Sequence, residues 1–186
     1  MEESSKAVPV CGRFPQVPFC GCTIPCRVAM KEVQLYKVLP GLYLGPLQAA
    51  YKVGELQEQG ITHILDLADQ PYTKYTDRFK YLSIAIADNE NEDLLQHFAS
   101  TNAFINDAIA RGGAVLVHCD ACVSRSPSVV IAYLLHSQRM DVDAALAFVR
   151  TARSRAKPNE GFMRQLRIYN SSLPSRCDSN SGGKTV

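Results

Sequence analysis

A cysteine and an arginine separated by five residues are the side chains best suited to chemistry in this 186-residue chain. Cys119 follows closely on the apolar run 114–117, which predicts a buried strand. Arg125 comes just before Pro127, and a proline suits the first turn of a helix because its missing N–H costs nothing there. The apolar segment 128–135 continues this predicted helix. The residues between the cysteine and the arginine are therefore expected to form a tight loop from the end of a strand to the start of a helix.

Such a loop suits an anion that carries several oxygens. Successive backbone N–H groups in a short loop can converge on one anion, and a helix N-terminus adds unpaired donors and a positive dipole end. The planar guanidinium of an arginine can donate to two phosphate oxygens. The same field lowers the pKa of a thiol from about 8.5 to about 3.5–7.5, which favours a nucleophilic thiolate over a cysteine that merely packs. The predicted phosphate-binding residues are Asp120, Ala121, Cys122, Val123, Ser124 and Arg125.

The elements that must position this loop are predicted from hydrophobic patterns and turn residues. Strand patterns alternate with helix patterns, which predicts an α/β fold with a single domain and a mostly parallel central sheet flanked by helices. A short strand and turn are predicted over 39–45, further strands over 61–67, 81–86 and 114–117, and helices over 47–59, 94–111, 126–135, 142–153 and 161–169. We expect the domain to span 31–170, between a flexible extension over 1–30 and a disordered tail over 171–186.

Composition disfavours several other classes of protein. The net charge of +2 does not suggest a partner made of nucleic acid, and no apolar stretch reaches the roughly 18–20 residues that insert into a bilayer. The seven cysteines fit no simple disulfide framework, and with the polar N-terminus they indicate a reducing, cytoplasmic location, with the nucleus as a second candidate. Four cysteines of the extension fit zinc spacing poorly, so free thiols are favoured over zinc or an attached lipid.

A thiolate that attacks a phosphate ester needs an acid to protonate the departing oxygen, and Asp88 is the candidate. It follows the predicted strand 81–86 almost directly. Parallel strands bring their carboxyl ends to one crevice, so the loop after this strand can meet the cysteine loop there. Glu90, Glu92 and Asp93 lie in the same acidic stretch and remain alternatives. Asp93 fits helix capping better, since it stands directly before the next predicted helix.

On these motifs the chain resembles the small (atypical) dual-specificity phosphatases of the cysteine-dependent protein-tyrosine-phosphatase superfamily. The similarity covers about residues 33–170, and its most specific part is 118–126 with the helix that follows. Leu-Tyr-Leu-Gly at 42–45 and Lys-Pro-Asn-Glu-Gly-Phe at 157–162 resemble further motifs of the family. The resemblance implies a phosphatase catalytic domain that hydrolyses phosphotyrosine, phosphoserine and phosphothreonine on proteins, with kinases among the candidate substrates and with no cofactor or metal.

The resemblance also implies a two-step mechanism through a phosphocysteine. Cys119 would attack phosphorus while Asp88 protonates the leaving oxygen, and Asp88 would then act as the base for water. Ser126 stands where the family uses a hydroxyl to stabilise the leaving thiolate, although simple helix capping would also explain it. The expected supporting residues are His118, which would orient the loop through hydrogen bonds, and Asn159.

One loop residue departs from the family pattern, which usually has glycine where this chain has Cys122. Glycine tolerates backbone angles that a side chain resists, and such strain costs of order 1–3 kcal/mol. This position leaves open the alternative of a weakly active or inactive module that binds phosphorylated proteins. Cys122 also offers a resolving thiol for reversible oxidation of Cys119, although a gap of two residues restricts disulfide geometry.

Other features bear on the substrate. The loop 68–80 is short, which in the family accompanies a shallow pocket that admits phosphoserine and phosphothreonine as well as phosphotyrosine. Asp120 and the lack of lysine in the cysteine loop argue against inositol phosphates. The acid precedes the cysteine loop, which disfavours a low-molecular-weight phosphatase or an arsenate reductase, and the small net charge disfavours RNA 5′ ends. The basic residues of the C-terminal third, Arg153 among them, are expected to form a solvated surface rather than a second docking site.

Overall fold

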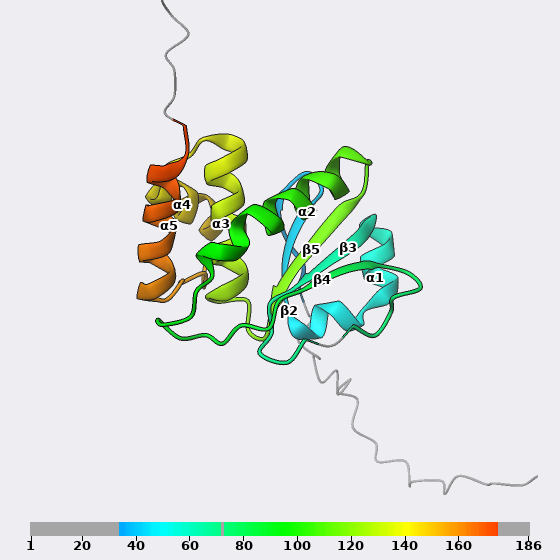
Figure 1. Ribbon diagram of the computed structural model, residues 1–186. Helices are drawn as coiled ribbons and strands as arrows, with labels where there is room; N and C mark the ends of the chain where they lie inside the picture. Colours follow the sequence, from blue (N-terminus) through cyan, green and yellow to red (C-terminus); the bar gives the residue numbers. More distant parts are fainter. Residues whose placement is uncertain (1–33, 72, 175–186) are drawn as a thin grey trace, which may run out of the picture. The chain divides into compact units, whose positions relative to one another are not determined.

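The computed structural model describes residues 34–71 and 73–174, so the predictions for 1–30 and for 175–186 lie outside the described residues. The strands are β1 (Tyr36–Leu39), β2 (Leu42–Pro46), β3 (Ile61–Asp66), β4 (Lys80–Ser83) and β5 (Ala114–Cys119). They form one sheet in the order β1-β2-β5-β3-β4 (Figure 1). The edge hairpin β1–β2 is antiparallel, and the other three pairings are parallel. The predicted α/β fold with a mostly parallel sheet is confirmed.

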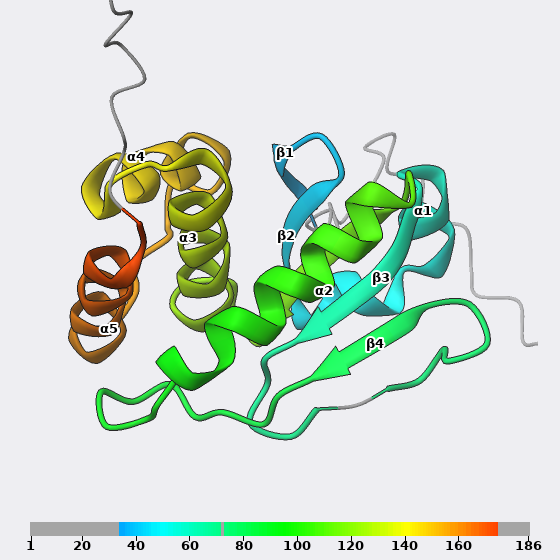
Figure 2. The same cartoon turned by 45° about the horizontal axis from the view of Figure 1, so that its top comes forward.

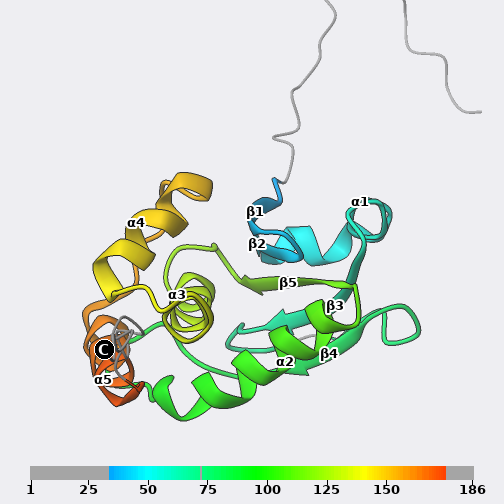
Figure 3. The same ribbon diagram turned by 90° about the horizontal axis from the view of Figure 1, so that it is seen from above.

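Helices cover both faces of this sheet. The α-helices are α1 (Val53–Glu58), α2 (Phe98–Ala110), α3 (Arg125–Gln138), α4 (Val142–Ala152) and α5 (Glu160–Ser172), and the 3-10 helices are η1 (Leu47–Tyr51) and η2 (Leu95–His97). Figure 3 shows α1 and α2 on opposite faces, each over its own hydrophobic core. Helix α3 packs against α2, and α4 and α5 pack against α3 (Figure 2). None of the helices in the described ranges is long and apolar enough to cross a bilayer.

The central strand β5 and helix α3 hold the two ends of the cysteine loop. Every residue of β5 is buried, and its alternate side chains enter the two cores on opposite faces of the sheet. A strand that is covered on both faces has a continuous run of apolar residues. This strand could therefore be predicted from the sequence. The strand ends at Cys119, and the buried part of α3 begins at Arg125. Both ends of the loop are therefore fixed in the core.

One predicted element near the N-terminal edge of the domain differs in the structure. The predicted helix 47–59 is divided into η1 and α1, because Lys52 (φ −89°, ψ 64°) leaves the helical region between them. The segment 39–45, predicted as a short strand and turn, is the turn and second arm of a hairpin, in which Gly41 takes a φ of 79° that favours glycine.

Two further boundaries also move. The predicted strand 81–86 pairs only as far as Ser83, because Ser83 lies opposite Asp66, the last residue of its partner strand β3. The residues after Ser83 are thereby released from the sheet and form the start of the acidic loop. At the other end of the domain, α5 continues to Ser172, so the first residues of the predicted tail are helical.

Helix α5 fixes the acidic loop that follows β4. The backbone N–H groups of Leu94 and Leu95 both donate to Gln165 Oε1, at 2.8 Å each. Gln165 Nε2 in turn donates to the carbonyl of Glu92 at 2.7 Å. One side chain thus satisfies three backbone groups that come just before α2. The loop is held to α5 although some seventy residues separate them in the sequence.

Close packing at Gly161 gives a test of this attachment. A Cβ at Gly161 would overlap the backbone of Glu90, and a backbone cannot move aside as a flexible side chain can. We expect Gly161→Ala to lower the free energy of unfolding by about 1–3 kcal/mol in urea denaturation. The matched control is Gly54→Ala in α1, where nothing lies within 4 Å of the added methyl group. There we expect no loss, or a gain of up to about 1 kcal/mol. Equal losses in the two variants would contradict this packing.

Candidate active site

The sulfur of Cys119 lies beside a hydroxyl group in the buried end of the site. Cys119 Sγ is 3.2 Å from Ser126 Oγ, and both residues are buried. Ser126 is the second residue of α3, whereas the N-cap position belongs to Ser124. The hydroxyl of Ser126 therefore faces the sulfur rather than capping the helix. A hydroxyl at this distance can donate a hydrogen bond to a sulfur anion.

Arg125 crosses from α3 to the loops that follow two neighbouring strands. Its Nη1 donates to the carbonyls of Leu67 (3.2 Å) and Ile86 (3.0 Å) and to Asp69 Oδ1 (2.5 Å). Its Nη2 donates to Asp120 Oδ2 at 2.6 Å. Burial lowers the pKa of Arg125, but the hydrogen bond to Asp120 and the surrounding negative charge outweigh it and raise that pKa above its ordinary value. The guanidinium is permanently charged.

A further donor of Arg125 has no partner among the described residues. Its Nε is buried and makes no hydrogen bond there. A buried donor without an acceptor costs about 1–3 kcal/mol, so native structures rarely leave one unused. Arg125 is the first residue of α3, and the loop before it begins at Cys119. A phosphate oxygen bound in this loop is an acceptor that would satisfy Nε.

Asp88 reaches the same site through Asn159. Asp88 Oδ1 accepts a hydrogen bond from Asn159 Nδ2 at 2.9 Å. The backbone N–H of Asn159 donates to Ser124 Oγ at 3.1 Å, and Asn159 Oδ1 caps α5 by accepting from Phe162 N at 2.9 Å. Asn159 thus joins the acidic loop, the cysteine loop and α5. A cavity of about 380 Å³ opens between these segments, and Asp88 and Asn159 both line it.

The alternative acids have other contacts. Asp93 Oδ1 accepts from the backbone N–H of Gln96 in η2 at 3.3 Å, but the N-cap residues are Leu94 for η2 and His97 for α2, so Asp93 does not cap the helix as expected. Glu90 lies 3.6 Å from Arg164 on α5, and the backbone of Glu92 is tied to α5. Asp88 is the member of this acidic stretch that bonds to a residue contacting the cysteine loop. The geometry therefore favours Asp88 as the acid.

The outer side of the cysteine loop is held by Arg153, which the sequence analysis assigned to a solvated surface. Arg153 Nη2 and Nε donate to the carbonyls of Ala121 and Cys122, at 3.2 Å each. The backbone N–H of Lys157 donates to the carbonyl of Val123 at 2.7 Å. Because these carbonyls are bonded on the outside, the loop keeps its N–H groups available for an anion on the inside. Arg153 could not be distinguished from other basic residues of this region before the fold was known.

Cys122 occupies the backbone conformation that favours glycine. Its φ is 55°, and its side chain is buried. Burial, together with the nearby charge of the other loop sulfur, raises the pKa of the Cys122 thiol to about 12. It is therefore protonated at neutral pH, and a protonated thiol is a poor partner for disulfide exchange. The redox role of Cys122 stays a prediction.

His118 is buried next to Asp66, at the end of the neighbouring strand. Its Nε2 lies 3.7 Å from Asp66 Oδ1, which is longer than a hydrogen bond. Burial lowers the pKa of His118, although the carboxylate of Asp66 acts in the opposite direction. His118 therefore supports the start of the loop as a neutral, packed imidazole.

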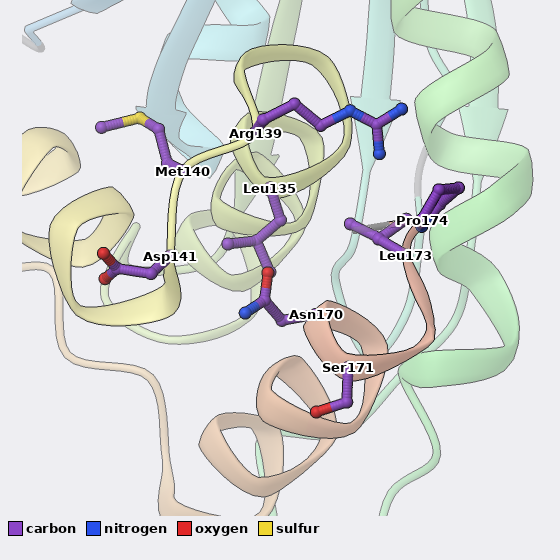
Figure 4. A pocket seen from close by; sticks show the side chains of 8 residues that line it. All are labelled: Leu135, Arg139, Met140, Asp141, Asn170, Ser171, Leu173 and Pro174. Atoms are coloured by element: carbon purple, nitrogen blue, oxygen red, sulfur yellow. The ribbon is translucent and has the colours of Figure 1, made fainter. Parts of the chain in front are cut away.

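Another cavity lies at the opposite end of α3. It has a volume of about 360 Å³ and is lined by residues from the end of α3, the start of α4 and the end of α5 (Figure 4). Arg139, whose side chain is labelled there, follows the last turn of α3. None of the residues predicted to do chemistry lines this cavity.

The combination of a buried sulfur, a hydroxyl, an arginine with a free N–H and a nearby carboxyl group is matched by a known family. The family model described as "Dual specificity phosphatase, catalytic domain" matches residues 42–172. The chain belongs to the dual-specificity phosphatase family. With its single matched domain it fits the small, atypical members, as the resemblance implied.

Curated relatives in this family are similar over most of the chain. Protein phosphatase Slingshot homolog 3 from Homo sapiens is 40% identical over 144 residues, which cover 77% of this chain but 22% of that protein. Serine/threonine/tyrosine-interacting protein from Homo sapiens is 38% identical over 168 residues, which cover 84% of this chain and 73% of that protein. The chain thus spans less than a quarter of the length of the Slingshot relatives that it matches.

Solved structures of the family share the fold. The crystal structure of human tyrosine phosphatase-like serine/threonine/tyrosine-interacting protein matches with a TM-score of 0.72 at 38% identity and covers 74% of this chain and 95% of that one. The crystal structure of human DUSP28 matches with a TM-score of 0.71 at 34% identity and covers 74% of this chain and 93% of that one. The family and the fold are therefore established together.

The linking role of Asn159 gives a second test. We expect Asn159→Ala to lower the free energy of unfolding by about 1 kcal/mol, because α5 loses its N-cap. We also expect hydrolysis of a phosphotyrosine peptide to slow by about tenfold, because an acid out of position loses part of a contribution of about 10²–10⁴. The matched control is Asp141→Ala, which removes the N-cap of α4. It should lose similar stability while keeping its rate, and equal rates in both variants would contradict the linking role.

Proposed function

We propose that this chain is a protein phosphatase that hydrolyses phosphotyrosine, phosphoserine and phosphothreonine through a phosphocysteine intermediate. Membership of the family supports phosphatase chemistry in general. The observation that carries the proposal for this chain is the buried Nε of Arg125, at the end of the loop that begins at Cys119, which has no partner within the described ranges. A positive donor in such a position suits an anionic group that arrives with the substrate.

In the proposed first step the thiolate of Cys119 attacks phosphorus, and the bond to the serine, threonine or tyrosine oxygen breaks. Asp88 gives its proton to that departing oxygen. Arg125 and the N–H groups of residues 120–125 hold the remaining phosphate oxygens, and this preorganised field stabilises the transition state. In the second step Asp88, now a carboxylate, takes a proton from water, which attacks phosphorus. The thiolate leaves and accepts a hydrogen bond from Ser126.

Phosphorylated proteins are the proposed substrates, and the cytoplasm, with the nucleus second, is the proposed location. The short loop over 68–80 supports a pocket shallow enough for phosphoserine and phosphothreonine. The same loop contributes Asp69, which accepts a hydrogen bond from Arg125 Nη1. Inositol phosphates are not proposed as substrates, because two carboxylates bond to Arg125 and the cysteine loop contains no lysine.

Hydrolysis of p-nitrophenyl phosphate and of phosphopeptides tests this proposal. We expect turnover by the wild-type protein and none by Cys119→Ser, because the alcohol is a far weaker nucleophile. Asp88→Asn should slow phosphopeptide hydrolysis by about 10²–10⁴-fold, since the leaving oxygen then departs without a proton. Glu92→Gln removes an equal charge from the same loop and should retain most of the rate. Turnover that survives Cys119→Ser would overturn the proposed mechanism.

The alternative function is a phosphatase-like module that binds phosphorylated proteins with little turnover. The left-handed backbone at Cys122 favours it, because strain there could hold the loop away from its best geometry. The similarity to a relative named serine/threonine/tyrosine-interacting protein is compatible with it. Against it stand the cysteine, the arginine and the acid, all present in this chain.

Cys122→Gly distinguishes the two functions. The glycine should relieve about 1–3 kcal/mol of strain in the loop. Where this strain weakens the binding of phosphate in the transition state, its relief should raise kcat/KM for p-nitrophenyl phosphate by about tenfold. The matched control is Arg139→Gly, which relieves the same kind of backbone angle (φ 54°) after the far end of α3. That variant should gain stability but keep the wild-type kcat/KM. An unchanged kcat/KM in Cys122→Gly would mean that this residue does not limit the enzyme.

A further inference from the structure

Two carboxylates share the guanidinium of Arg125, and both reach solvent. The side chain of Arg125 is 7% exposed, whereas those of Asp69 and Asp120 are 59% and 48% exposed. Each carboxylate therefore presents one side to the buried arginine and the other to whatever approaches the site. Their charges compete with any anion that binds to the same arginine.

The two carboxylates are not equivalent. Asp69 bonds to Nη1, which the carbonyls of Leu67 and Ile86 also hold in place. Asp120 bonds to Nη2, and among the described residues it is the partner of that nitrogen. Asp120 also directly follows Cys119, and its carbonyl is fixed by the backbone N–H of Leu47 at 3.1 Å. Its carboxylate is thus held close to the place where the substrate phosphorus must lie.

An incoming phosphate must bind next to this carboxylate. Nη2 and Nε are the donors of Arg125 that a phosphate could use together, since Nη1 is already bonded to three oxygens. Asp120 already takes one bond from Nη2. Two negative groups on one guanidinium repel each other, and a positive charge placed on the outer side of Asp120 would relieve that repulsion.

The surroundings provide more negative than positive charge for such a partner. The cavity beside the cysteine loop is lined by the acidic residues Asp88, Glu90 and Glu160 and by the basic residue Lys157, and Arg164 lies 3.6 Å from Glu90. The nearby Arg153 is occupied by loop carbonyls and by Tyr36. A lysine or arginine next to the phosphorylated residue of a substrate would therefore meet carboxylates.

We propose that Asp120 is a specificity-determining residue, which selects phosphopeptides that carry lysine or arginine directly beside the phosphorylated residue. The substrate cation pairs with the exposed side of Asp120 and so leaves Nη2 of Arg125 to the phosphate. Substrates with an acidic or second phosphorylated residue in that place are disfavoured by the same charge. This inference rests on the proposed function for its catalytic readout, and it names the substrate class of that site.

Three phosphotyrosine peptides that differ only in the two residues flanking the phosphotyrosine test the inference. The flanking residues are both lysine, both glutamine or both glutamate. For the wild-type protein we expect kcat/KM to be about threefold to fivefold higher for the lysine than for the glutamine peptide, and lower by a similar factor for the glutamate peptide. In Asp120→Asn the asparagine can still accept the bond from Nη2, but the lysine preference should fall to less than about twofold.

Asp143→Asn is the matched control, because Asp143 is an exposed acid in the first turn of α4, at the opposite end of α3 from Arg125. It should keep the wild-type preference among the peptides. A lysine preference that is absent from the wild type, or that is unchanged in Asp120→Asn, overturns the inference even if hydrolysis is fast.

A binding measurement separates this inference from the proposed activity. The affinities of Cys119→Ser for the three peptides, measured by calorimetry, report the charge preference without turnover. If the wild-type protein hydrolyses none of the peptides, the proposed function fails, and the order lysine, glutamine, glutamate in these affinities still supports the role of Asp120. Equal affinities, or no binding of any peptide, overturn the role of Asp120.

Discussion

The buried guanidinium of Arg125 is the contact on which the site depends. It joins the start of α3 to the loops after β3 and β4 and to the residue after Cys119. Its three bonds on one nitrogen are made to oxygens from two separate loops, so the planar group has little freedom to turn. A positive charge can be buried here because oxygens surround it. The same oxygens orient the remaining N–H groups for an anion.

A second set of contacts holds the loop that carries Asp88, the proposed acid, beside the cysteine loop. Asn159 and Gln165, both on or beside the start of α5, bind the loop that carries Asp88. The cysteine loop is tied to the same region through Ser124 and through the N–H of Lys157. Cys119 and Asp88, the proposed nucleophile and acid, come from different parts of the chain, and residues at the start of α5 contact both of the loops involved. Proposed catalysis depends on such positioning as much as on the reacting groups themselves.

Much of the fold and the centre of the site could be predicted from local patterns. The apolar run before Cys119 predicts the buried strand, and Pro127 indicates the start of the following helix. The loop between these two elements could therefore be predicted directly. One boundary that failed was set by a partner: the strand predicted over 81–86 stops at Ser83 because its neighbour stops there. Pairing between strands depends on both partners, so the residues of one strand do not show where the pairing ends.

Residue type and spacing were enough to select Cys119 and Arg125 as candidates, because the loop that joins them is short and its ends are set by adjacent elements. They were not enough to separate Arg153, which holds the outer carbonyls of that loop, from the other basic residues of its region. They also gave no sign that Asp69 would bond to Arg125, since 56 residues separate the two. Contacts across such distances arise only when the sheet brings its strand ends together, and the folded chain alone decides which charges then meet.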